Sequence, residues 1–166
     1  MNNDEFVTEW PSGEPETPCG KGSMLAETKI IRRILPEYVE AWGIKTINDI
    51  GCGDQNWINE IKWPWEVEIK SFDIRPRYSD VTPFDVTREV APKADLILCI
   101  YVLNHLKPRQ KERAYRLLKE SESEYLLTTF NEYDKVPYPF MREREDHKET
   151  GRHKWAYGLW DLQDEE

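Results

Sequence analysis

Residues 48–57 read NDIGCGDQNW: an apolar run ends in Gly51-Cys52-Gly53, and a polar segment follows. Two glycines after an apolar run predict a strand-to-helix turn at which a ligand can approach the backbone closely. The dinucleotide-binding pattern GxGxxG requires a third glycine at position 56, where this chain has Asn56. Because a pyrophosphate binds at a bare helix N-terminus, the missing glycine favours a ligand that has no pyrophosphate.

Helical patterns lie on both sides of this turn. Residues 23–42 carry apolar side chains at helical spacing, with Gly43 as the expected stop and Pro36 expected to kink or split the helix. A second helix is expected at 109–119. Its inward-facing side chains are expected to be Ala114, Leu117 and Leu118.

Apolar runs between the helical patterns predict strands. They lie at 46–50, 68–72, 84–86, 94–100, 125–130 and 154–162. The run at 94–100 is almost continuously apolar, which is typical of a parallel strand buried on both faces. The alternation predicts an α/β fold, a Rossmann-like, mostly parallel sheet with helices on both faces and an antiparallel C-terminal edge strand at 154–162.

Composition limits the function classes. The 166 residues suit one domain, and 39% hydrophobic with 33% charged residues predict a globular chain. No apolar run reaches the roughly 18 residues of a membrane helix, and the acidic start does not resemble a signal peptide. Residues 1–20, with Pro11, Pro15 and Pro18, are expected to form a flexible arm before a single domain at 21–166.

The net charge and the cysteine spacing also limit the kinds of ligand and the cellular compartment that we expect. A net charge of −9 argues against broad nucleic-acid binding, and the mixed-charge stretches 107–119 and 142–154 are expected to be solvated helix or loop surface. Cys19, Cys52 and Cys99 have no metal-like spacing, so no metal site and a reducing cytoplasmic location are expected.

Acidic residues end three of the expected strands. Asp49 precedes the glycine turn, Asp73 lies twenty residues after Gly53, and Asp85 follows the third apolar run. An acid in the position of Asp73 can accept hydrogen bonds from ribose hydroxyls. Asp85 could accept from an adenine amino group or form a plain Asx turn. The set predicts an adenosine site, which NAD and S-adenosylmethionine (SAM) both need.

Several motifs in this order resemble the class I SAM-dependent methyltransferases, most closely small bacterial and viral members. They are GSMLAET (22–28), DIGCGDQNW (49–57), FDI (72–74), FDVT (84–87), LILCIYVLNHL (96–106), YLLTT (125–129) and LWDL (159–162). The resemblance covers about residues 20–162. Two features depart from it: only about 24 residues separate the last two strands, and Tyr101 stands where many relatives have an acid.

The resemblance implies SAM as cofactor and roles for particular residues. Asp49, Gly51 and Gly53 would cradle SAM, Asp73 would hold the ribose and Asp85 the adenine. The remaining expected cofactor contacts are Gly22, Ser23, Thr28, Cys52, Asp54, Asn56, Trp57, Ile74, Val86, Cys99, Ile100 and Tyr101. Gln55 could also face the cationic end of SAM.

Candidate catalytic residues follow the fourth apolar run. His105 could act as a general base, with Asn104 and Tyr101 beside it, or it could simply bond to backbone at a helix start. Methyl transfer to nitrogen or sulfur can proceed by positioning alone, so a base is not required. The chain lacks the D/N-P-P-Y/F/W motif of amino-methylating DNA methyltransferases.

Aromatic and histidine residues elsewhere have competing interpretations. Trp57 could shield a sulfonium or pack a short helix, whereas Trp63 and Trp65 are expected to pack. The segment after the fifth strand is expected to face the substrate through Tyr133, Tyr138, Phe140 and His147. His147 and His153 are too isolated to predict a metal site.

The predicted function is methyl transfer from SAM to a small molecule or an accessible polar group, with neither nucleic acid nor membrane as partner. Three alternatives stay open at this point: a SAM-cleaving enzyme, a non-catalytic SAM-sensing or partner-binding module, and, more remotely, a nicotinamide dehydrogenase.

Overall fold

The computed structural model of the chain describes residues 16–131, 142–149 and 155–163. In this part of the chain, seven strands form one sheet in the order β3-β2-β1-β4-β5-β7-β6. Five of them pair in parallel, and β7 and β6 pair antiparallel beyond β5. The strands are β1 (Thr46–Ile50), β2 (Glu68–Asp73), β3 (Val81–Pro83), β4 (Leu96–Cys99), β5 (Tyr125–Asn131), β6 (Arg142–Glu149) and β7 (Trp155–Asp161). The predicted α/β, Rossmann-like sheet is confirmed.

The strand order places a topological switch point between β1 and β4. From β1 the chain runs outward to β2 and β3, and then returns to β4 on the other side of β1. In such sheets, the crevice at the carboxyl ends of the two strands beside the switch point is the usual ligand site. The β1–β2 register pairs Ile50 with Phe72, so the glycine turn after β1 and the end of β2 lie at the same edge.

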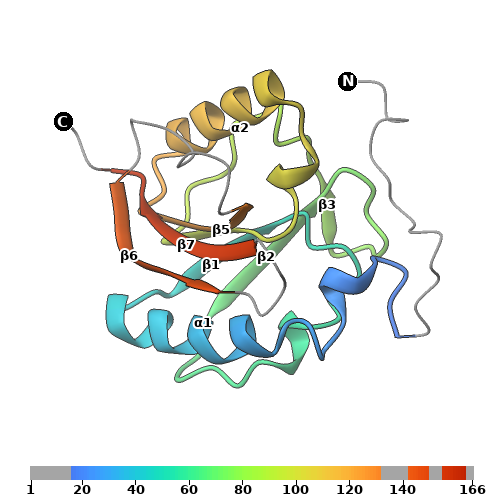
Figure 1. Cartoon of the computed structure of the whole chain (residues 1–166), viewed down its shortest axis with the longest axis vertical. Helices are drawn as coiled ribbons and strands as arrows, with labels where there is room; N and C mark the ends of the chain where they lie inside the picture. The colour runs from blue at the N-terminus through green and yellow to red at the C-terminus, as the bar shows by residue number, and fades with distance from the viewer. Residues whose placement is uncertain (1–15, 132–141, 150–154, 164–166) are drawn as a thin grey trace.

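Two α-helices cover opposite faces of the sheet (Figure 1). On one face, α1 (Lys29–Trp42) buries Ile31 and Leu35 in a core that includes Ile47 and Leu98. On the other, α2 (Pro108–Glu120) packs with strand side chains such as Trp160. Neither helix of the described residues has the length and hydropathy of a transmembrane span.

Both helices depart in detail from the sequence prediction. A 3-10 turn, η2 (Lys21–Ser23), precedes α1, which starts at Lys29 and not at Ser23. Pro36 does not split α1, because the apolar face packed on the sheet outweighs one lost backbone hydrogen bond. The helix ends at Gly43 as expected, with φ +64°. On α2 it is Tyr115, and not the half-buried Leu117, that is buried beside Ala114 and Leu118.

Three predicted segments at the sheet edges are corrected. The third strand is Val81–Pro83, and residues 84–86 follow it as an irregular segment. The antiparallel strand β7 is internal, because β6 pairs outside it. Residues 142–149 are therefore a strand and not helix or loop surface. Their many charged residues favoured the surface interpretation. Charged residues are nevertheless common in edge strands, because they discourage pairing with other chains.

Candidate functional site

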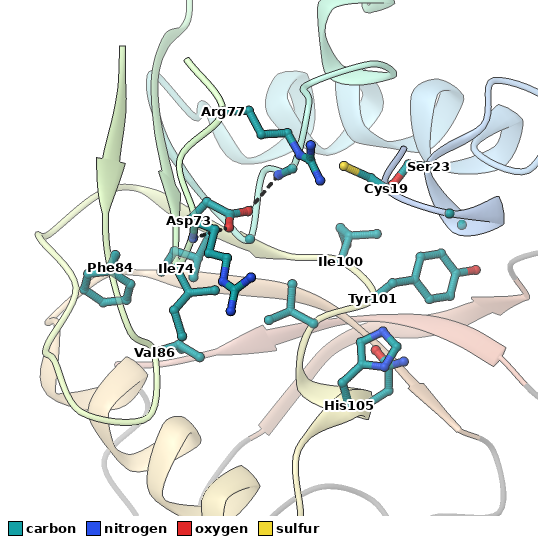
Figure 2. Close-up of a pocket in the computed structure, with 18 of the residues that line it drawn as sticks. Cys19, Ser23, Asp73, Ile74, Arg77, Phe84, Val86, Ile100, Tyr101 and His105 are labelled. Atoms are coloured by element: carbon teal, nitrogen blue, oxygen red, sulfur yellow. Dashed lines mark hydrogen bonds between the residues drawn. The ribbon is translucent and has the colours of Figure 1, made fainter. Parts of the chain in front are cut away.

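A cavity of about 390 Å³ lies at the carboxyl edge of the sheet, beside the switch point. It brings together twelve of the residues that the sequence predicted for a site: Gly22, Ser23, Gly51, Gly53, Asp73, Ile74, Asp85, Val86, Ile100, Tyr101, Asn104 and His105. Figure 2 shows Asp73, Ile74, Phe84 and Val86 on one side of it and Tyr101 and His105 on the other. Residues from distant parts of the sequence thus share one cavity.

The glycine turn after β1 forms the floor of the cavity. Gly51 (φ +77°) and Gly53 (φ +56°) have left-handed backbone conformations that favour glycine. A Cβ on Gly51 would collide with Val102, and one on Gly53 would lie 2.9 Å from Cys19 Sγ. The turn leads into only the three-residue 3-10 turn η3 (Ile58–Glu60), so the expected helix after it does not form. No α-helix lies between β1 and β2 to present its N-terminus to a phosphate.

The carboxylate of Asp73 joins the end of β2 to this turn. Its Oδ2 accepts a hydrogen bond from Gly53 N at 2.9 Å, and its Oδ1 accepts one from Arg75 N at 2.9 Å (Figure 2). Phe72 O accepts from Gly51 N at 2.8 Å and from Cys52 N at 3.1 Å. The acid therefore lines the cavity in a fixed orientation, with both oxygens held from the backbone side.

Asp49 lies behind the turn and does not line the cavity. Asp49 is part of the central strand β1 and is only 3% exposed. Burial, and to a smaller extent the Asp73 carboxylate, raises the pKa of Asp49 from 3.8 to about 7. Burial also raises the pKa of the Cys52 and Cys99 thiols, which keeps them protonated, and neither residue lines the cavity.

Asp85 forms the plain turn that the sequence left open as an alternative. Its Oδ1 accepts hydrogen bonds from Thr87 N at 2.9 Å and Thr87 Oγ1 at 2.6 Å. Its own backbone N donates to Glu89 Oε2 at 2.7 Å. Asp85 still lines the cavity, so its turn role and a ligand contact are compatible.

Asn56, in the place of the missing glycine, ties an upstream segment to the turn. Its Nδ2 donates to Glu16 Oε1 and to Ser23 O, both at 2.9 Å. Glu16 Oε1 also accepts from Leu25 N at 2.7 Å. The tied segment supplies residues 19–23 of the cavity wall, so the described end of the expected N-terminal arm is part of the site.

Four more of the predicted cofactor residues lie outside the lining: Thr28, Asp54, Asn56 and Trp57. Trp57 is buried in the core on the α1 face, so its side chain packs. Trp63 packs against the same core, and Trp65, although partly exposed, donates from Nε1 to Ile44 O at 2.9 Å. The interpretation of Trp63 as a packing residue is confirmed, whereas Trp65 is 38% exposed and does not pack against this core.

The end of β4 brings the candidate catalytic residues into the cavity. Tyr101 has a left-handed backbone (φ +54°), rare for a residue with a side chain, and its N donates to Thr129 Oγ1 at 2.7 Å. The 3-10 turn η4 (Leu103–His105) follows. His105 is exposed at the rim, yet desolvation of its ring lowers its pKa below 6.5, against a smaller opposing effect of a hydrogen bond to the Tyr101 backbone.

Sequence reasoning missed nine lining residues: Cys19, Gly20, Lys21, Ile50, Arg75, Arg77, Phe84, Val102 and Trp155. Most adjoin predicted residues, so a wider window around each motif could have found them. Trp155 had no such signal, because it reaches the site only through the β5–β7 pairing, opposite Asn131.

Several predicted substrate-facing and histidine residues lie outside the part of the chain that the structure describes. Tyr133, Tyr138, Phe140 and His153 lie outside the described residues, as does the side chain of His147. Among the described residues, no group of three or more His, Cys, Asp or Glu side chains is placed to hold a metal ion.

Comparisons with known proteins bear on the fold. No protein-family model and no curated protein matches the sequence. Solved structures do match: the chain is similar to a magnesium protoporphyrin IX methyltransferase from Synechocystis PCC 6803 with bound SAM (12% identity, TM-score 0.59, 81% of this chain and 78% of that one). It is also similar to the N-methyltransferase NodS from Bradyrhizobium japonicum WM9 in complex with S-adenosyl-l-homocysteine (14%, 0.61, 83% and 88%).

A third similar structure is a small RNA methyltransferase, at 11% identity and a TM-score of 0.63, over 83% of this chain and 25% of that one. At such identities the likeness concerns the fold. This chain has the Rossmann-like fold of the class I SAM-dependent methyltransferases.

Proposed function

We propose that this protein is a SAM-dependent methyltransferase that acts on a small molecule. The observation that carries the proposal is the meeting of the glycine turn, Asp73 and the end of β4 in one cavity at the switch point. The volume of about 390 Å³ is within the range of small-molecule sites. The solved structures with this fold include enzymes with bound SAM or its demethylated product, which supports the same cofactor here.

The residues present fit SAM better than a dinucleotide. Gly51 and Gly53 line the cavity and have no side chains, so a ligand can approach the backbone of the turn closely. Asp73 lies at the end of β2, where an acid can hold ribose hydroxyls. A pyrophosphate would need a helix N-terminus at this turn, and the three-residue η3 does not supply one.

Asp49 can serve the cationic end of the cofactor from behind the turn. A carboxyl with a pKa near 7 would ionise more readily beside a positive charge. Arg77 also lines the cavity and lies near Cys19 (Figure 2).

The chemistry then needs mainly positioning. SAM, when bound, would supply an electrophilic methyl group that an acceptor's lone pair could take from sulfur, leaving a neutral thioether. The chain holds the acceptor at the end of β4 and excludes water. His105, neutral at pH 7, can take the proton that an N–H or O–H acceptor loses.

Calorimetry with the full chain tests the cofactor. SAM should give binding heat and NADH none, and Asp73→Asn should weaken SAM binding. Asp80→Asn makes the same charge change at an exposed position outside the cavity and should leave binding as it is. Binding of NADH in place of SAM would overturn the proposal.

Product analysis separates methyl transfer from the alternatives. S-adenosylhomocysteine must appear in proportion to a methylated acceptor when candidate acceptors are supplied. Breakdown of SAM without a methylated product would instead identify a SAM-cleaving enzyme.

A further inference from the structure

The cavity has a charged end and an uncharged end. Of its five charged lining residues, four lie between positions 73 and 85, and the fifth is Lys21 on η2. The end of β4 and the start of β7 contribute only side chains without a formal charge at pH 7: Tyr101, Val102, Asn104, His105 and Trp155. Figure 2 shows the separation of Asp73 from Tyr101 and His105 across the cavity.

An aromatic wall stands at the uncharged end. The rings of Tyr101 and Trp155 meet edge to face, with centroids 6.0 Å apart and planes at 77°. Tyr101 holds a left-handed backbone there, fixed by the hydrogen bond from its N to Thr129 Oγ1. Backbone strain of this kind persists where the surroundings impose it, and it concentrates at functional sites. The wall is therefore preorganised for a flat, apolar group.

A hydrogen-bond acceptor lies beside this wall. Asn104 lines the cavity, and its Oδ1 is buried without a hydrogen-bond partner among the residues that the structure describes. A buried carbonyl oxygen without a partner is costly, so it is expected to accept a hydrogen bond from a bound ligand. The neighbouring His105 adds no positive charge at neutral pH.

We infer that the uncharged end binds the methyl acceptor as a neutral, flat ring that carries an N–H or O–H group. The ring packs on Tyr101 and Trp155, and its donor hydrogen bonds to Asn104 Oδ1. Charged substrates should bind weakly because this end of the cavity offers them no counter-charge. Substrates without an N–H or O–H group should bind weakly because they would leave Asn104 Oδ1 without a hydrogen bond. The inference rests on the proposed function, and it specifies the substrate class for that site.

Two probes of equal size test the donor. Indole carries a ring N–H, and benzofuran has an oxygen in its place. Ligand-observed NMR titrations of the full chain saturated with S-adenosylhomocysteine should show indole binding about tenfold more tightly, the effect of one hydrogen bond to a buried acceptor. Asn104→Leu should abolish the preference by weakening indole alone, whereas Asn104→Asp, which keeps an acceptor oxygen, should retain it.

The outcomes separate the inference from the proposed function. If S-adenosylhomocysteine binds but indole binds no better than benzofuran, or neither probe binds, the inference is wrong and the cofactor assignment survives. If S-adenosylhomocysteine itself does not bind, both fail. If Asn104→Leu does not fold, the wild-type comparison and Asn104→Asp decide the matter.

Discussion

Replacing Asp49 by asparagine should remove a large pH dependence of stability. The folded chain keeps the Asp49 proton up to about pH 7, whereas the unfolded chain releases it near 3.8. Folding therefore takes up a proton between these values. The contribution of Asp49 to stability is fully present below pH 3.8 and is lost as the pH rises through 7. From pH 5 to pH 8 the free energy of unfolding should fall by about 2.5 kcal/mol on this account.

The assay is urea unfolding of wild type and Asp49→Asn, each without ligand, at pH 5 and pH 8. The useful quantity is the double difference, because the fixed cost of burying an amide cancels between the two pH values. Between pH 5 and pH 8, the free energy of unfolding of the wild type should fall by about 2.5 kcal/mol more than that of Asp49→Asn. Asp80→Asn, at an exposed site, is the control, and its double difference should be close to zero.

A double difference near zero for Asp49→Asn would refute the reasoning, because it would mean that the buried carboxylate is stabilised as well as in water. The same variant should bind SAM less tightly than wild type at pH 8, measured by calorimetry. Stabilisation combined with weaker binding is the expected signature of a group kept for a ligand.

Four further outcomes are expected. Gly51→Ala forces a left-handed alanine against Val102 and should destabilise the fold by about 1–3 kcal/mol or more, read from urea unfolding; an unchanged midpoint would contradict it. Asp73→Ala should weaken SAM binding by about 1–3 kcal/mol, and unaltered affinity in a folded variant would sink the ribose assignment. Asn56→Ala unties the upstream segment and should weaken SAM binding by about 0.5–1.5 kcal/mol with little change in melting temperature. For His105→Ala, SAM affinity should persist while turnover drops, and the wild-type rate should fall with acid through an apparent pKa below 6.5; a variant with full turnover would leave His105 a structural role.

The turn at 48–57 shows what a local pattern can predict. Glycine spacing and flanking apolar runs correctly placed β1 and the turn, because positive φ values and buried strands leave direct marks on residue choice. The absent third glycine was informative, but its replacement could not be interpreted locally. The partners of Asn56 are Glu16 and Ser23, forty and thirty-three residues upstream.

The edges of the sheet were the hardest to predict. The segment 142–149 carries seven charged residues and no apolar alternation, so its sequence does not indicate a strand. It pairs with β7 through backbone groups, which every sequence possesses. Trp155 enters the cavity wall by the same kind of pairing, since the β5–β7 register sets it opposite Asn131.

The sequence by itself determined the alternation of helices and strands, the glycine turn and the acids at the strand ends, because burial period and backbone conformation act on neighbouring residues. Tertiary structure alone decided which of those acids lines the cavity and which is buried behind it. Asp49 and Asp73 occupy similar sequence contexts, yet one lies on a strand enclosed on both faces and the other at a strand end open to the cavity. The polarity of the surroundings of each carboxyl depends on how the chain packs, so the different roles of Asp49 and Asp73 follow only from the tertiary structure.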